Sequence, residues 1–295
     1  MQSPGVPFAW LTLPLLVQAA PDGFYVSLSL CLPLSQMCGS IVPCSWCYDS
    51  QNPQCVLLSL GGAWGQEQGR VCIWGGGLPH IYCALQLHFH WGSPTGNGSE
   101  HTLNGQRQPM EMHMVHMNTL YQSLEEARGH PGGLAVLAFL FKVQNEDNVN
   151  YNTIVSGLKN ISHQGESVEL ASTFRLDKLL PDLALLSRYY RYPGSLTTPA
   201  CDEVVLWTIF EEPVPIGRAQ LAQFVSTLQA SPPGAQAISM INNFRPAQPI
   251  GSRRVLASPD ATVSGGPPFP LPMEIWALLC LLLSMGCGSG SSGAL

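Results

Sequence analysis

Three histidines have the residue type and spacing of a metal site. His88 and His90 lie two residues apart in the apolar segment 84–91, and His113 lies in a second segment, 111–117. In a β-strand alternate side chains share one face, so the three imidazoles can converge if the two segments are neighbouring strands. Three neutral imidazoles leave one position open on a tetrahedral zinc ion, which is typical of catalytic zinc. The spacing therefore suits Zn²⁺ as a cofactor, a prediction that the sequence motifs described below strengthen.

Two polar residues on the same strand faces are candidates to orient these ligands. Gln86 and Glu111 each precede a histidine by two residues. A metal-bound imidazole usually donates its second N–H to such a group, so we expect them to fix the tautomers of His88 and His113. Alone, a His-x-His pair is weak evidence for zinc, because histidines often occupy sheets as ordinary polar residues.

The segments around the histidines read as sheet with short helices. The apolar run 134–143 follows a turn and predicts a buried strand, and 204–210 predicts another. Helical spacing occurs at 152–159, 176–186 and 217–228. The leucines of the second of these segments form a stripe that is typical of a core-facing helix.

Composition narrows the class of protein. The chain has 295 residues, which fits one large domain or two small ones. Its formal charge is -6 and only 11% of its residues are charged, which argues against a nucleic-acid surface. Ten cysteines are many for a reduced cytosolic enzyme and favour an oxidising compartment.

Six motifs carry a family resemblance that covers residues 75–258. In chain order they are LQLHFHWG, GSEHTLNG, EMHMVHMN, PGSLTTPAC, VVLWTIFEEP and NNFRPAQP. Several independent motifs in one order seldom arise by chance, and these resemble an α-class carbonic anhydrase. The resemblance implies a mainly β (α+β) fold, with a large, mostly antiparallel central sheet, short peripheral helices and zinc at the base of a cleft.

The resemblance also implies an activity, the reversible hydration of carbon dioxide to bicarbonate and a proton by a monomeric zinc lyase. By the motif match, Thr197 orients the attacking hydroxide and Glu100 receives the Thr197 hydroxyl proton. Thr198 would flank the bicarbonate site, and we read His101 and His116 as structural. The apolar wall of the carbon dioxide pocket would consist of Val115, Val136, Leu196, Val205 and Trp207.

The resemblance fails in one part of the chain. Residues 45–55, SWCYDSQNPQC, resemble the start of the mature domain in the membrane-anchored branch, the type-four and type-fifteen enzymes, in which Cys47 and Cys55 would pair. From residue 56 to 74 the match is lost, and several dozen family residues are absent before Gly75. We therefore expect N-terminal strands of the family to be missing from the sheet.

The same gap removes two functional groups of the family. One is the histidine that shuttles protons, which leaves the shuttle here unknown, with His80 as an unassigned candidate, and predicts slow proton transfer. The other is the cysteine that pairs with the one matching Cys201. Cys72, Cys83 or an N-terminal cysteine are alternative partners, and an unpaired Cys201 is a further alternative.

The two ends suggest processing. Residues 1–44 hold apolar runs that indicate a signal peptide, although no basic residue precedes them, so misassigned coding sequence is the alternative. Residues 45–258 form the carbonic-anhydrase-like domain. Residues 259–295 form a linker and a hydrophobic tail, whose apolar run 275–287 is shorter than the roughly 20 residues of a membrane span.

The tail resembles a signal for a GPI anchor, with small residues at 264–266 before it. Sequons at Asn97 and Asn160 allow N-glycosylation of a secreted chain. We expect the secretory route to the outer leaflet of the cell surface, with simple secretion or a short membrane span as alternatives. Two other functional hypotheses stay open, a non-catalytic binding module and an isoform that keeps the motifs without folding.

Overall fold

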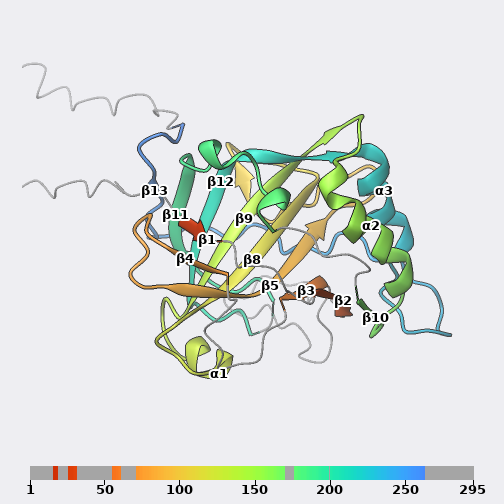
Figure 1. The fold of residues 1–295 in the computed structure, drawn as a ribbon, viewed down its shortest axis with the longest axis horizontal. Coiled ribbons are helices and arrows are strands. Elements are labelled where there is room, and N and C mark those ends of the chain that lie inside the picture. Colours follow the sequence, from red (N-terminus) through yellow and green to blue (C-terminus); the bar gives the residue numbers. More distant parts are fainter. Residues whose placement is uncertain are drawn as a thin grey trace, which may run out of the picture. The chain divides into compact units, whose positions relative to one another are not determined.

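The structure is a computed structural model, and its central feature is one large sheet. It describes the backbone of three N-terminal strands at 16–18, 26–31 and 55–60, and residues 71–169, 176–198 and 200–262. The sheet has 11 strands in the order β10-β2-β3-β5-β8-β9-β12-β11-β13, while β1 pairs with β4 and β4 also with β5 (Figure 1). Every pairing is antiparallel except that of β9 with β12. The predicted mainly β, mostly antiparallel fold is confirmed.

The two histidine-bearing strands and three further strands are consecutive in the sheet. These are β5 (Tyr82–Trp91), β8 (Met110–Asn118), β9 (Leu134–Gln144), β12 (Val205–Gly217) and β11 (Tyr189–Gly194). The runs predicted as strands at 134–143 and 204–210 are thus confirmed. Three short strands of the same sheet are β4 (Cys72–Trp74), β10 (Ser167–Glu169) and β13 (Leu256–Ala257). A separate two-stranded sheet consists of β6 (Thr102–Leu103) and β7 (Gln106–Arg107).

The two histidine-bearing strands are direct neighbours. In the antiparallel pair β5–β8, His88 lies opposite His113, and His90 lies opposite Glu111. A register shift between Ala84 and Gln86 ends before the histidines. Because directly opposite residues point to the same face of a sheet, this register brings all three imidazoles to one face.

The two faces of the sheet bury different clusters. One face packs aromatic and methionine side chains, and its members on the central strands are Leu87, Phe89, Trp91, Met112, Met114, Leu137, Phe139, Phe141 and Phe210. The other face, which carries the histidines, packs a smaller apolar cluster that includes Val115, Met117, Leu134, Val136, Ala138, Val205, Trp207 and Ile209. We refer to these as the core face and the site face.

Strand β5 has neighbours on both sides, and three strands of this part of the sheet come from the N-terminal part of the chain. Strand β3 (Cys55–Leu60) pairs with β5, β2 (Val26–Cys31) pairs with β3, and β1 (Leu16–Gln18) pairs with β4. The backbone groups of β5 therefore find partners in β3, from a segment in which none of the six sequence motifs lies. Strands β1 and β2 lie inside residues 1–44, and the removal of that segment as a leader stays a prediction.

The helices are short. They are α1 (Leu124–Arg128), α2 (Asn152–Leu158) and α3 (Arg218–Thr227), with 3₁₀ turns η1 (Val149–Tyr151), η2 (Lys159–Ile161), η3 (Leu176–Leu179) and η4 (Leu183–Leu185). The helices predicted at 152–159 and 217–228 are confirmed.

The single helix predicted at 176–186 is wrong. The segment forms two 3₁₀ turns, η3 and η4, on either side of Pro181, whose ring lacks an N–H and interrupts helical hydrogen bonding. Leu179 is fully buried, whereas Leu183 is 59% exposed, so the leucines do not share one buried face.

A disulfide joins Cys72 of β4 to Cys83 of β5, at directly opposite positions of the strand pair. These two cysteines are therefore not partners of Cys201, which corrects one of the alternatives. Cys47 lies outside the described residues and only the backbone of Cys55 is described, so their predicted pairing is not tested.

Candidate metal centre

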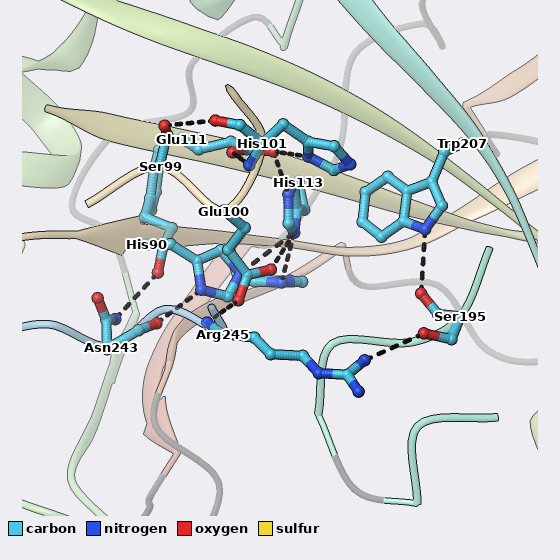
Figure 2. Close-up of polar contacts among 12 residues, drawn as sticks. His90, Ser99, Glu100, His101, Glu111, His113, Ser195, Trp207, Asn243 and Arg245 are labelled. Carbon is cyan, nitrogen blue, oxygen red and sulfur yellow. Dashed lines mark hydrogen bonds and ion pairs between the residues drawn. The ribbon is translucent and has the colours of Figure 1, made fainter. Parts of the chain in front are cut away.

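The three predicted ligands converge on the site face. The Nε2 atoms of His88 and His90 lie 3.3 Å and 3.1 Å from Nδ1 of His113, and all three side chains are buried (Figure 2). A tetrahedral zinc ion with bonds of about 2.0–2.1 Å holds its ligand nitrogens about 3.3 Å apart. Both distances to His113 therefore match the separation that a zinc ion requires, and the three ligand atoms all lie within 4.8 Å of one another.

Each imidazole is oriented by a hydrogen bond on its far side. The outward nitrogen of every ligand lies 2.7 Å from an oxygen acceptor, in the pairs His88 Nδ1 with Gln86 Oε1, His90 Nδ1 with Asn243 O, and His113 Nε2 with Glu111 Oε1. A carbonyl, amide or carboxylate oxygen accepts a proton and does not donate one. The outward nitrogens therefore carry the N–H, and the three inward nitrogens present lone pairs.

This arrangement of lone pairs fits a cation. Burial, followed by the neighbouring imidazoles, holds the pKa of His88 well below its usual 6.5. Burial likewise lowers the pKa of His113, although Glu111 partly opposes it. The inward nitrogens therefore resist protonation. A metal ion bound by all three lone pairs would stabilise their close approach.

Glu100 lies beside the ligand nitrogens. Its Oε1 accepts the backbone N–H of Arg245 at 2.6 Å, and its Oε2 lies 3.5 Å from His90 Nε2. This Oε2 is buried and has no hydrogen-bond partner within the part of the chain that is described. The carboxylate therefore offers an acceptor next to the metal site.

The hydroxyl of Thr197 is predicted to donate to that acceptor. Thr197 lies half-buried in the loop after β11, together with Leu196 and Thr198. Among the described residues it makes no hydrogen bond to Glu100, so its role stays a prediction.

A second hydrogen-bond network supports Glu111. Its Oε1 lies 2.5 Å from His101 Nδ1, and its Oε2 accepts the His101 backbone N–H at 2.8 Å. The other ring nitrogen of His101 lies 2.7 Å from the Tyr192 hydroxyl. Burial alone would raise the pKa of Glu111, but His101 and His113 lower it well below the usual value. Glu111 therefore stays ionised while it holds His113.

The five residues predicted to line the carbon dioxide pocket lie together on the site face. Four belong to its apolar cluster and the fifth packs against them, the set being Val115, Val136, Val205, Trp207 and Leu196. The Trp207 ring lies edge-on to the His113 ring at 4.7 Å. The structure thus places an apolar surface directly beside a ligand.

Two residues of the site were missed from the sequence because they act through main-chain atoms. Asn243 accepts from His90 through its carbonyl, and Arg245 donates to Glu100 through its backbone N–H (Figure 2). Both lie in the motif NNFRPAQP, which was noted only for its resemblance. The available signal was this motif itself, which holds two Asn and one Arg although it lies far from the ligands in sequence.

The sequons differ in their surroundings. Asn97 is exposed, but its Nδ2 donates to the Arg107 carbonyl at 2.8 Å and Ser99 of the sequon is buried. Asn160 is exposed in the 3₁₀ turn η2, which follows α2. Glycosylation of either stays a prediction. Within the described residues, none of the helices has the length and apolar content that a membrane span requires.

A buried three-imidazole group with fixed tautomers, on one face of a large, mostly antiparallel sheet, is a site that could hold a metal ion. Comparison with known proteins sharpens this description. The family model described as eukaryotic-type carbonic anhydrase matches residues 39–259. The chain therefore belongs to the eukaryotic-type carbonic anhydrase family.

Its relatives include the two types that the sequence motifs resembled. Over 237 residues the chain is 52% identical to carbonic anhydrase 15 of Mus musculus, covering 80% of this chain and 70% of that protein. It is 40% identical over 237 residues to carbonic anhydrase 4 of Oryctolagus cuniculus, covering 79% and 72%. The predicted resemblance to this family is confirmed.

Proposed function

We propose that the protein reversibly hydrates carbon dioxide to bicarbonate and a proton, with Zn²⁺ bound by His88, His90 and His113. The observation that carries the proposal is the set of three inward nitrogens, in which His88 Nε2 and His90 Nε2 lie 3.3 Å and 3.1 Å from His113 Nδ1. Each ring is fixed by a hydrogen bond at its opposite nitrogen. Carbonic anhydrase is itself the standard case in which zinc brings the pKa of its bound water to about 7.

The surrounding residues hold the ligands and a proton acceptor in place. Gln86 and Glu111 keep His88 and His113 in the tautomer that faces the metal. Glu100, fixed by the Arg245 backbone N–H, keeps its Oε2 free to accept the Thr197 hydroxyl proton. With that proton donated, the Thr197 oxygen acts as an acceptor toward the reacting water.

Substrate and product have different requirements. Carbon dioxide is apolar, and the cluster that contains Val115, Val136 and Trp207 supplies an apolar surface beside His113. Bicarbonate is charged and needs polar contacts, which we assign to Thr198. The site face therefore accommodates both.

Proton removal to the solvent is the step with no assigned residue. His80 is exposed and precedes β5 by two residues, so it is a candidate shuttle. We expect slow turnover in weak buffer, with a rate that rises in high concentrations of imidazole buffer. A turnover in weak buffer that does not respond to imidazole would contradict this expectation.

We further propose the secretory route and a lipid anchor on the outer leaflet, with N-glycans and a monomeric state. The small residues and short apolar run of the tail support the anchor, and the cysteine content and sequons support the compartment. Release of the protein from intact cells by a phospholipase that cleaves GPI anchors tests this, and retention after that treatment contradicts it.

One experiment separates the functional hypotheses. The full chain is produced in animal cells, and its zinc content, its carbon dioxide hydration rate and its inhibition by a sulfonamide are measured. One zinc per chain with inhibitable hydration supports the enzyme. One zinc without hydration supports a binding module, and an aggregated chain without zinc supports an isoform that does not fold. His163→Gln, at a half-exposed histidine outside the site, is the control variant and is expected to match the parent.

A further inference from the structure

The loop that carries Thr197 is held at its start by two side chains from distant parts of the chain. Ser195 immediately precedes the loop residues 196–198. Its carbonyl accepts the Trp207 Nε1–H at 3.0 Å, and its hydroxyl oxygen accepts from Arg245 Nη1 at 3.2 Å (Figure 2). Trp207 belongs to the sheet, whereas Arg245 comes from the segment after α3.

Arg245 also holds Glu100, through a different part of the same residue. Its backbone N–H donates to Glu100 Oε1 at 2.6 Å, while its guanidinium reaches Ser195. Arg245 is thus hydrogen-bonded both to Glu100, beside the metal ligands, and to Ser195, the first residue of the loop that contains Thr197. Displacement of its side chain would change the separation between Thr197 and Glu100.

We infer that Arg245 is a positioning residue. Its side chain holds the loop 195–198 in the position where the Thr197 hydroxyl can donate a hydrogen bond to Glu100. The inference rests on the proposed function for its catalytic consequence, but the mechanical link itself does not. The guanidinium is a rigid fork on a long stem, and lysine at this position would offer a compact ammonium with no fixed geometry.

The bond to Ser195 is the main constraint on this guanidinium. Nε of Arg245 is buried and has no hydrogen-bond partner in the described part of the chain. Loss of the Ser195 hydroxyl would therefore leave the guanidinium without its hydrogen bond and release the start of the loop. The next residue of the loop has a backbone hydrogen bond of its own, since the Leu196 N–H donates to the Asp202 carbonyl at 2.9 Å. That amide is a reporter of how well the loop is held.

The test compares Arg245→Met, Ser195→Ala and the double variant with the parent chain. The methionine variant keeps the backbone N–H that binds Glu100 and removes only the side-chain donors. The matched control is Arg254→Met, at an exposed arginine of the same C-terminal segment. The readouts are zinc content, kcat and KM for hydration, and hydrogen exchange of the Leu196 amide measured by mass spectrometry.

We expect both single variants to retain zinc, to exchange the Leu196 amide about tenfold faster, and to leave a peptide of β5 unchanged. We expect kcat/KM to fall about tenfold with a smaller change in kcat, because the loop acts on the reaction at carbon and not on proton removal to buffer. The double variant should be no worse than either single variant, since both break one bond.

Parent-like Leu196 exchange in both single variants would overturn the inference, as would losses that add in the double variant. If Arg245→Met fails to fold, the milder Ser195→Ala still decides the question. A parent chain without hydration activity would refute the proposed function, while faster exchange in the variants would still establish the link between Arg245 and the loop.

Discussion

His113 and His116 lie three residues apart on the same strand, both are 1% exposed, and they project from opposite faces of the sheet. On the site face, His113 has Glu111 behind it and two imidazoles in front of it. On the core face, His116 Nδ1 lies 2.9 Å from the Met114 carbonyl oxygen. Burial keeps both imidazoles neutral, so it does not identify a ligand. Convergence of several lone pairs does.

The largest expected effect, on zinc affinity, comes from the removal of a metal ligand on the site face. His113→Gln removes one of three ligands, so we expect zinc to dissociate, with affinity more than about 100-fold lower, beyond the loss typical of an outer partner. Hydration activity should fall with the zinc. His116→Gln is the matched change on the core face, and folded protein of that variant should keep one zinc. Equal zinc loss in both variants would contradict the assignment of the two faces.

The next largest expected effect, on the free energy of unfolding, comes from the truncation of a buried side chain on the core face. Phe139 is fully buried and its ring stacks on Phe210 at 4.7 Å between centroids. Truncation in Phe139→Ala leaves a cavity, and we expect a loss of about 3–5 kcal/mol in the free energy of unfolding. Denaturant titration measures the loss. Zinc per folded chain should stay at the parent value, and a selective loss of zinc at full stability would contradict the separation of the two faces.

Acid should destabilise the fold through the core-face histidine. Burial lowers the pKa of His116 to about 4, against 6.5 in the unfolded chain. Between these values the unfolded chain binds a proton that the folded chain does not, so the contribution is full above pH 6.5 and is lost as the pH falls toward 4. It amounts to at most about 3 kcal/mol.

The measurement is the free energy of unfolding of the parent and of His116→Gln from pH 7.5 to 4. The parent should lose stability more steeply than the variant below pH 6.5, and the difference between them should be constant above pH 7. Parallel curves over the whole range would show that His116 does not titrate differently in the folded and unfolded chain.

The smallest effect sharpens the role of the group behind His113. Glu111→Gln keeps an oxygen acceptor but removes the negative charge, and we expect zinc affinity to fall about 10–100-fold. Competition with a zinc chelator gives the value. An unchanged affinity would show that the charge of Glu111 is not needed, although its hydrogen bond to His113 could still be.

The alternation of side chains along the two strand segments was enough to predict the ligands and their hydrogen-bond acceptors, because strand periodicity determines which side chains share a face. His88, His113, Gln86 and Glu111 all lie where this argument placed them. The contribution of Asn243 was not predictable in the same way. It acts through a carbonyl oxygen, which every residue has, and it lies 153 positions from His90.

The fold was predictable where the periodicity of apolar residues and the family motifs indicated the same element. It was less predictable in segments where only one of these signals was present. The strand at 26–31 comes from an apolar run that reads equally well as the core of a signal peptide, since both need only a short apolar stretch. The leucine stripe of 176–186 has helical spacing, but Pro181 divides it. The Cys72–Cys83 disulfide depends on strand register, which cysteine spacing alone does not determine.

X-ray absorption at the zinc edge of the purified full chain tests the central claim most directly, because it identifies the atoms bound to the metal. The account predicts three imidazole nitrogens and one light atom at about 2.0–2.1 Å. The chain has ten cysteines that offer competing ligands. A spectrum dominated by sulfur at about 2.3 Å, or a folded chain that takes up no zinc, would contradict it.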